Sequence, residues 1–234
     1  MDISLLHKID RDIATQLKTL GIGEKRPQKH LFPSITISRE FGCEATPLAQ
    51  LLVKKLSTDP YPWVMFHRKL ITEITEKEEI QKDIIESIGT WQRGKLHQYI
   101  EHLLIHKPGN LKLYKKIAEA VRILAEKGRS VILGAGAAII TSEMPRMLHV
   151  RLQAPLDFRV KRVSRVLEIS ETEAKEVIRD NDLQREAFVY EFTRKNIHDP
   201  SHYDLIFDNS KFNAEQITEL IHSALLLRNM LPKT

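Results

Sequence analysis

A glycine turn between a strand-like and a helix-like segment is the place in this sequence best suited to bind an anion. Residues 34–38 alternate isoleucine with serine and threonine, which is typical of a strand, and Gly42 follows. Thr46 is a good N-cap residue, and Pro47 suits the first position of a helix. Such a turn points the free N–H groups of the helix N-terminus beyond the sheet edge, where a phosphate can bind.

The turn lacks the side chains of a regular phosphate loop. That loop has a glycine, four residues, and then glycine, lysine and serine or threonine. Counting from Gly42, the last three places hold proline, leucine and alanine, and Glu44 adds negative charge. No lysine is placed for the phosphates and no hydroxyl for Mg²⁺. The spacing alone leaves two interpretations open, an anion-binding loop and an ordinary strand-to-helix turn.

Two groups of charged residues later in the chain could hold an anion. Arg159, Arg162 and Arg165 recur every third residue, so on a helix they gather on about one side. A row of this kind either neutralises an anion or is a solvated helix face. Asp182 and Arg185 are three residues apart on a later helix, a spacing that also suits an ordinary ion pair.

Five apolar segments that alternate with helical patterns predict how these residues are positioned. The expected strands are at about 35–38, 63–66, 130–133, 148–152 and 203–207. The alternation is typical of a parallel sheet with helices on both sides. Ligands of such sheets bind beyond the carboxyl ends of the strands, so Gly42, Gly134 and the arginine row are expected to converge there.

The composition indicates a soluble protein with anionic partners. The chain has 234 residues, is 42% hydrophobic and carries a net charge of +5, which favours a ligand such as a nucleotide. Nucleic acid ranks low, because no aromatic–basic stacking motif accompanies the charge. No apolar run reaches the roughly 18 residues of a membrane span.

The one cysteine and a pair of histidines give weaker evidence about function. Cys43, the one cysteine, excludes an internal disulfide and fits a cytoplasmic location. Its place in the turn suits a reactive thiol or a small residue in place of serine. His102 and His106 have the spacing of a zinc pair on a helix, but a third ligand with proper spacing is missing, so no metal site is expected.

The turn sequence resembles a known family. Residues 38–42 read Ser-Arg-Glu-Phe-Gly, which is similar to the first motif of the cytidylate kinase-like family, relatives of the nucleoside monophosphate kinases with a P-loop fold. The resemblance covers about residues 34–225. It implies a three-layer α/β/α fold with a mostly parallel five-stranded sheet and a helical subdomain.

The family's chemistry would be phosphoryl transfer from ATP, with Mg²⁺, to CMP or dCMP. By resemblance, four residues of the turn would meet the donor nucleotide: Arg39, Gly42, Cys43 and Thr46. The arginine row would stabilise charge on the transferring group. The acceptor would be held by Arg68, Gly134, Asp182 and Arg185.

The same resemblance suggests how the chain is divided. Residues 1–30 are expected to form an amphipathic helix and a linker, and residues 31–234 the cytidylate kinase-like domain. Within it, about 66–110 would be the helical acceptor-binding subdomain and about 155–195 a lid-like helical region. The N-terminal helix would either cap the domain or pair with a second copy in a homodimer.

The sequence departs from the family at three functional places. Thr46 replaces a basic residue of the turn, His67 replaces an acidic residue, and Ala135 replaces an arginine between two glycines. These changes keep an alternative open, in which a kinase-like fold binds a nucleotide or another anion without transferring phosphate.

Overall fold

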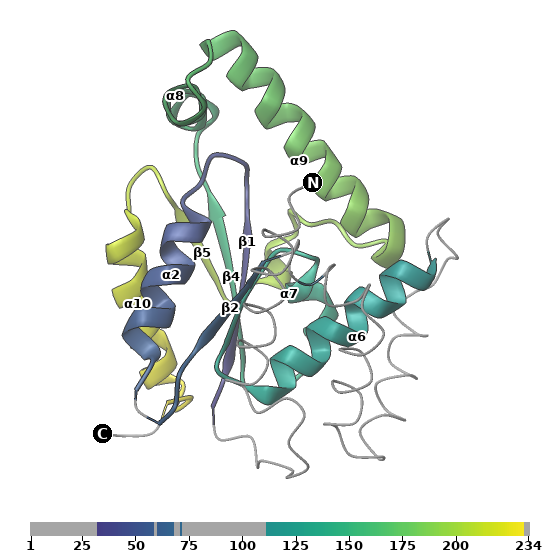
Figure 1. Cartoon of the computed structure of the whole chain (residues 1–234), viewed down its shortest axis with the longest axis vertical. Helices are drawn as coiled ribbons and strands as arrows, with labels where there is room; N and C mark the ends of the chain where they lie inside the picture. Colours follow the sequence, from purple (N-terminus) through teal and green to yellow (C-terminus); the bar gives the residue numbers. More distant parts are fainter. Residues whose placement is uncertain (1–31, 59, 68–70, 72–110, 232–234) are drawn as a thin grey trace, which may run out of the picture.

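Five strands form an all-parallel sheet at the centre of the part of the chain that the computed structural model describes, which is residues 32–58, 60–67, 71 and 111–231. The order across the sheet is β2-β3-β1-β4-β5 (Figure 1). In chain order the strands are β1 (Ser34–Arg39), β2 (Val64–His67), β3 (Ser130–Leu133), β4 (Met147–Gln153) and β5 (Leu205–Asp208). The mostly parallel five-stranded sheet predicted from the sequence is confirmed.

Helices cover both faces of the sheet and complete three layers. On one face, α2 (Ala45–Leu56) and α10 (Ala214–Leu227) pack on apolar side chains of β1, β3 and β4. On the other face, α6 (Leu111–Lys127) and α7 (Ala137–Ile140) pack on side chains of β2 and β3. None of the helices in the described part of the chain is long and apolar enough to span a membrane.

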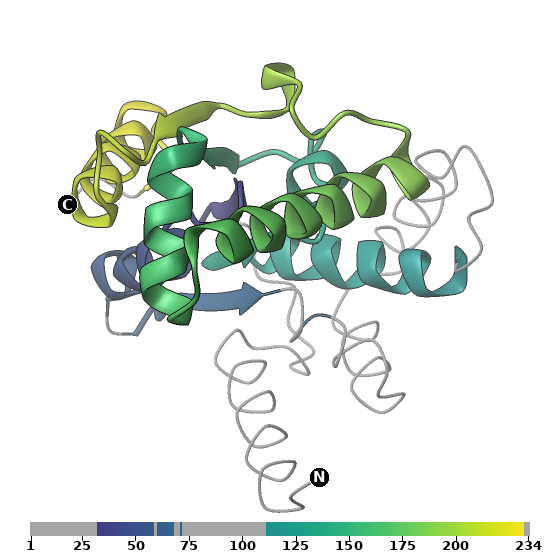
Figure 2. The same cartoon turned by 90° about the horizontal axis from the view of Figure 1, so that it is seen from above.

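Two further helices lie beyond the carboxyl ends of the strands. They are α8 (Leu156–Leu167) and α9 (Glu171–Thr193), and they pack on each other through Val160, Val163 and Ile178. Seen from above, α9 runs across the end of the sheet (Figure 2). A capping box between Ser170 and Glu173 starts α9. This pair of helices brings residues of α8 and α9 over the turn that follows β1.

The start of α2 differs from the sequence prediction. Thr46 is predicted as the N-cap, but the helix begins at Ala45, and Glu44 holds the N-cap position without a side-chain cap. The backbone N–H of Glu44 instead donates to Asn209 Oδ1 at 2.7 Å, which fixes the chain two residues before the predicted N-cap. Pro47 remains in the first turn, where amides have no partner within the helix.

Several predictions fall outside the described residues and stay predictions. They concern residues 1–30 with the homodimer, most of the acceptor-binding subdomain at about 66–110, Arg68, and the histidine pair His102 and His106.

Candidate active site

The turn between β1 and α2 is pressed against α8. Gly42 has a φ of +94°, a backbone conformation that suits glycine. A Cβ atom at Gly42 would lie 3.0 Å from Arg159 Cβ and 3.3 Å from its Cα. The absence of a side chain therefore lets the backbone of α8 approach the turn, and it places Arg159 beside Gly42.

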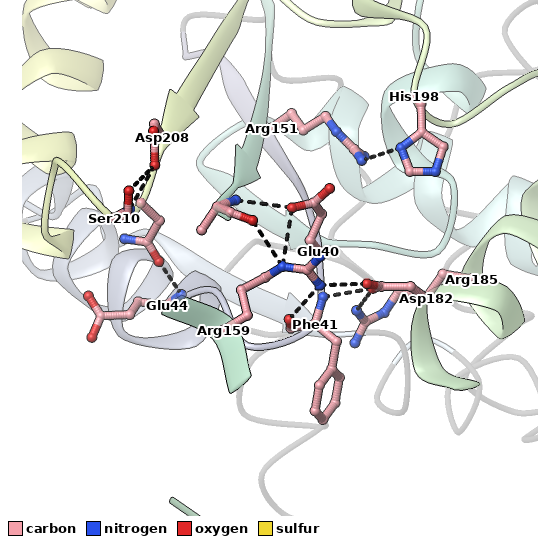
Figure 3. A network of polar contacts seen from close by, with 12 residues as sticks. Glu40, Phe41, Glu44, Arg151, Arg159, Asp182, Arg185, His198, Asp208 and Ser210 are labelled. Atoms are coloured by element: carbon pink, nitrogen blue, oxygen red, sulfur yellow. Dashed lines mark hydrogen bonds and ion pairs between the residues drawn. The ribbon is translucent and has the colours of Figure 1, made fainter. Parts of the chain in front are cut away.

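Asp182 of α9 joins the turn to both helices (Figure 3). Its carboxylate accepts the backbone N–H of Phe41 at 2.7 Å, Arg159 Nη1 at 2.7 Å and Arg185 Nη1 at 3.3 Å. Arg185 also lies over the Phe41 ring, 5.2 Å from its centroid. The predicted pair Asp182–Arg185 is thus an ion pair whose carboxylate also holds the turn.

Arg159 is buried within this network. Its Nε donates to the carbonyl of Ala154 at 3.0 Å and lies 3.5 Å from Glu40 Oε2, and its Nη1 also donates to the carbonyl of Phe41. The Glu40 carboxylate accepts the backbone N–H of Ala154 as well. Arg159 therefore connects the turn, the end of β4 and α9.

The other two arginines of the predicted row have different surroundings. Arg162 Nη1 lies 2.5 Å from Glu44 Oε1, so the acidic residue of the turn forms an ion pair with α8. Arg165 is exposed and lines neither of the two pockets described below. Residues six apart on a helix differ in direction by about 120°, which explains why Arg165 does not share the face of Arg159.

A first pocket, which we call the turn pocket, lies between the turn and α8. It is lined by residues 39–43, Ala45, Thr46, Arg185 and four residues of α8, which are Arg162, Val163, Val166 and Leu167. Ala45 and Thr46 belong to the first turn of α2, where N–H groups have no acceptor within the helix. The turn pocket therefore combines helix amides with arginine side chains, a combination that suits an anion.

A second pocket, which we call the sheet-edge pocket, lies beside the first. Its walls are the ends of β1 and β3, the start of α7, the side of α9 with Arg185 and Phe188, and the loop residues Ile197 and Tyr203. Gly134, at a φ of +72°, is part of the wall, and any Cβ atom there would overlap the guanidinium of Arg39. Arg39 and Arg185 line both pockets, so the two pockets meet at two arginines.

Cys43 has an environment that disfavours a reactive thiol. Burial, and next the charge of Glu40, raise the pKa of the Cys43 thiol to about 12. The reactive form is the thiolate, which is scarce at neutral pH when the pKa is so high. Of the two interpretations left open by the sequence, the structure favours a small packing residue.

The carboxylates near the turn are engaged by protein groups. Among the described residues, no group of three or more His, Cys, Asp or Glu side chains is arranged to hold a metal ion. Glu40, Glu44 and Asp182 each contact an arginine. In this arrangement these residues do not form a protein site for Mg²⁺, which usually binds through one or two carboxylates together with substrate phosphates.

Two buried polar residues near the site are not identified by the sequence analysis. Asn209 is buried, accepts the N–H of Glu44 and donates to the carbonyl of Phe212 at 2.9 Å. Arg151, near the end of β4, is 3% exposed. Both could have been found from their positions, since each is a polar residue at the carboxyl end of a predicted strand.

Comparisons with known proteins identify a family and a similar fold. A family model described as "Cytidylate kinase-like family" matches residues 34–211. An uncharacterized protein from Eubacterium ventriosum has a similar structure, with a TM-score of 0.65 and 20% identity over 84% of this chain and 98% of that chain. A shikimate kinase from Bacteroides thetaiotaomicron superposes with a TM-score of 0.46 and 14% identity over 85% and 99% of the two chains.

One curated sequence is also similar over part of its length. A protein named uronate isomerase from Corynebacterium glutamicum is 25% identical over 159 residues. These residues are 66% of this chain but 30% of that protein, so the match spans a minor part of it.

Proposed function

This chain belongs to the cytidylate kinase-like family, and from this membership we propose that it transfers a phosphoryl group from ATP to a nucleoside monophosphate, CMP or dCMP. The observation that carries the proposal is the meeting of the turn pocket and the sheet-edge pocket at Arg39 and Arg185. A transferase needs two neighbouring sites whose phosphates approach each other, and cations where they meet.

The turn pocket is the proposed donor site. First-turn amides of α2, at Ala45 and Thr46, would face the phosphates of ATP, and Arg162 would add positive charge from α8. Gly42 lets α8 lie this close to the turn. Arg159 has a different proposed role from the one the family resemblance implies, because its donors hold Ala154, Phe41 and Asp182.

The sheet-edge pocket is the proposed acceptor site. Its apolar wall, with Phe188 and Ile139, suits the base of a nucleotide, while Arg39 and Arg185 suit its phosphate. Gly134 contributes by leaving room for the Arg39 guanidinium. Arg68, the remaining proposed acceptor contact, lies outside the described residues.

Phosphoryl transfer requires no covalent intermediate on the protein. The transition state carries charge on the oxygens of the transferring group, and catalysis consists of positioning and electrostatic stabilisation. Mg²⁺ bound with ATP would neutralise part of that charge. Because the carboxylates near the turn contact arginines, we assign none of them as a metal ligand.

A specific observation favours a second candidate function, nucleotide binding without transfer. Protein carboxylates already occupy groups that a phosphate would use: Glu44 pairs with Arg162, and Asp182 accepts the N–H of Phe41. Together with the missing lysine, these contacts suit a chain that holds a nucleotide or another anion but does not react with it.

An assay combined with titration calorimetry separates the two functions. Purified protein is incubated with ATP, Mg²⁺ and CMP or dCMP, and formation of the nucleoside diphosphate is followed. The transferase predicts diphosphate well above the protein-free blank. Binding of CMP or ATP in the calorimeter without turnover supports the second function, and no binding of any nucleotide contradicts both.

A matched pair of variants on α9 tests the role of the shared arginines. Arg185→Ala removes a cation common to both pockets, and we expect turnover to fall at least about 100-fold. Arg179→Ala removes an exposed arginine of the same helix, whose side chain is 68% exposed, and should leave turnover within about twofold. Equal turnover in both variants would contradict the assignment of Arg185.

A further inference from the structure

One face of β1 carries polar side chains in a place where apolar ones are expected. The strand is at the centre of a parallel sheet covered on both faces, and such strands are usually apolar throughout. Ile35 and Ile37 meet this expectation on the side of α2 and α10. The side chains on the opposite face are Ser34, Thr36 and Ser38, all at most 9% exposed.

The polar residues of β1 are matched by polar residues of β4. Thr36 is in register with His149, and Ser38 with Arg151. Thr36 Oγ1 lies 2.9 Å from His149 Nδ1, and Arg151 Nη1 donates to Ser38 Oγ at 3.2 Å. Thr36 and Ser38 also line the sheet-edge pocket, so this polar stripe ends at the floor of that pocket.

Arg151 is a buried cation with neutral partners. Its Nη1 donates to Ser38 Oγ and to the carbonyl of Ile197, and its side chain lies 5.5 Å from the centre of the Tyr203 ring. Within the described ranges it makes no ion pair with a carboxylate. Burying a charge without a counter-ion costs free energy, so this position is best explained by a negative charge that binds nearby.

His198 contacts both Arg151 and the acidic side chain of Glu186. Arg151 Nη2 lies 2.9 Å from His198 Nδ1 (Figure 3), and because a guanidinium can only donate, Nδ1 is the acceptor. The ring proton is then on Nε2, which donates to Glu186 at 2.7 Å. A neutral imidazole therefore lies between Glu186 and Arg151. Glu186 does not contact the Arg151 guanidinium through this histidine, so the positive charge can act on a ligand in the pocket.

The Ser38 hydroxyl proton has one long contact, to Tyr203, among the described residues. The Tyr203 hydroxyl lies 2.6 Å from the carbonyl of Ile197 and 3.2 Å from Ser38 Oγ. Tyr203 has one hydroxyl proton, and the shorter contact to a carbonyl uses it. The 3.2 Å contact then requires the Ser38 proton, donated to the Tyr203 oxygen, because Arg151 already fills a lone pair of Ser38 Oγ. A phosphate oxygen in the pocket that Ser38 lines would replace Tyr203 as the acceptor of this proton.

We propose that Ser38 and Arg151 form an anion subsite at the floor of the sheet-edge pocket, which holds the phosphate monoester of the ligand. Ser38 donates a hydrogen bond to a phosphate oxygen. Arg151 is a positioning residue that orients Ser38 and adds a positive charge behind it. This inference rests on the proposed function for the identity of the ligand, a nucleoside monophosphate, but not for turnover.

Calorimetric titration with three probes tests the subsite. The probes are CMP, which has a phosphate monoester, inorganic phosphate, which has no nucleoside, and cytidine, which has no phosphate. We expect Ser38→Ala to weaken binding of CMP and of inorganic phosphate about 10-fold, the effect of a hydrogen bond to a charged group. Binding of cytidine should change by less than about twofold, because the subsite does not contact the nucleoside.

Ser34→Ala is the matched control, and Arg151 is tested by two variants. Ser34 is a buried serine on the same face of β1 that donates to the carbonyl of Ala125 and does not line the pocket, so all three affinities should be unchanged. Arg151→Lys keeps the charge and should retain more anion affinity than Arg151→Gln. Thermal melting of each variant confirms that it is folded.

The outcomes distinguish this inference from the proposed function. The inference is overturned if folded Ser38→Ala binds CMP as tightly as the wild type does. It is also overturned if the substitution weakens binding of cytidine as much as binding of CMP. Anion binding that depends on Ser38, without any turnover, supports the subsite and contradicts the transferase. A wild-type protein that binds neither CMP nor inorganic phosphate overturns both.

Discussion

The turn pocket and the sheet-edge pocket lie side by side but differ in how their charges are balanced. Around the turn, acidic and basic side chains meet directly: Glu44 with Arg162, and Asp182 with Arg159 and Arg185. Beneath the sheet-edge pocket, the buried cation Arg151 contacts a hydroxyl, a carbonyl and a neutral imidazole.

This difference indicates which groups stabilise the fold and which are available to a ligand. Residues of the turn that a phosphate could use are also structural, because they hold α8 and α9 over the sheet. Residues beneath the sheet-edge pocket leave positive charge unbalanced within the described part of the chain. Substitutions at the turn should therefore act mainly on stability, and those near the sheet-edge pocket mainly on binding.

The largest effect is expected from Asp182→Ala. The substitution leaves the N–H of Phe41 and the buried Arg159 without their acceptor, and we expect the free energy of unfolding to fall by about 3 kcal/mol. Urea unfolding followed by circular dichroism measures it. Asp180→Ala, which removes an exposed pair with Arg179 on the same helix, should cost less than about 0.5 kcal/mol. Similar losses in the two variants would show that Asp182 does not join the helices.

A pair of glycine variants should separate the two pockets. In Gly42→Ala, the new Cβ atom meets the backbone of α8, and the φ of +94° is strained for alanine. We expect the free energy of unfolding to fall by about 2 kcal/mol. In Gly134→Ala, the new atom meets the end of a flexible side chain, Arg39, so the loss of stability should be about 1 kcal/mol.

Ligand binding should show the complementary result for Gly134→Ala. Displacing the Arg39 guanidinium removes a cation from the sheet-edge pocket, and CMP should bind about 10-fold more weakly in calorimetry. If Gly134→Ala lost as much stability as Gly42→Ala but kept its affinity for CMP, the contrast between the pockets would be wrong.

A smaller effect is expected when the charge balance of the turn is changed. Glu44→Gln removes the carboxylate that pairs with Arg162 but keeps the size of the side chain. Release of Arg162 should tighten binding of ATP about threefold, consistent with the weak energy of a partly exposed ion pair. Calorimetric titration of ATP into the wild type and into Glu44→Gln measures the change in affinity. Lys55→Gln, which removes an exposed ion pair with Glu219, is the control. Weaker binding of ATP by Glu44→Gln would mean that Glu44 helps to hold the donor.

The smallest effect should come from Cys43, and only at high pH. Burial raises the pKa of its thiol to about 12 in the folded protein, above its ordinary value of 9.0. The stability that protonated Cys43 contributes is therefore fully present below pH 9 and is lost as the pH rises from 9 toward 12. The difference in urea midpoint between the wild type and Cys43→Ser should be constant at pH 7 and 8 and shrink above pH 9. A difference that already changes between pH 7 and 8 would indicate a reactive thiol.

The sequence was sufficient for the layers of the fold because their signals are local. Apolar runs such as residues 130–133 predict strands buried on both faces, and the helices between them require parallel connections. The exact start of α2 was missed because the contact that fixes it, from Glu44 to Asn209, joins residues 165 positions apart.

The details of the site depended on similarly distant contacts. Residue spacing placed the arginines on one helix, but it did not indicate that Arg159 would be buried, Arg162 paired with Glu44, and Arg165 exposed. The separations of Arg162 from Glu44, 118 positions, and of Asp182 from Phe41, 141 positions, leave no local pattern. The polar residues of β1 are visible in the sequence, because polar side chains are unusual on a strand at the centre of a covered sheet. The register between β1 and β4 explains them, since it places them beside polar residues of β4.

A crystal structure of the protein soaked with ATP and CMP tests the central claim most directly. The claim is that two nucleotides bind in neighbouring pockets that share Arg39 and Arg185. We predict phosphate density from both ligands between these two guanidinium groups, with the CMP base toward Phe188. Density for either nucleotide at another edge of the sheet, or no density at the two arginines with ligand present at saturating concentration, would contradict the account.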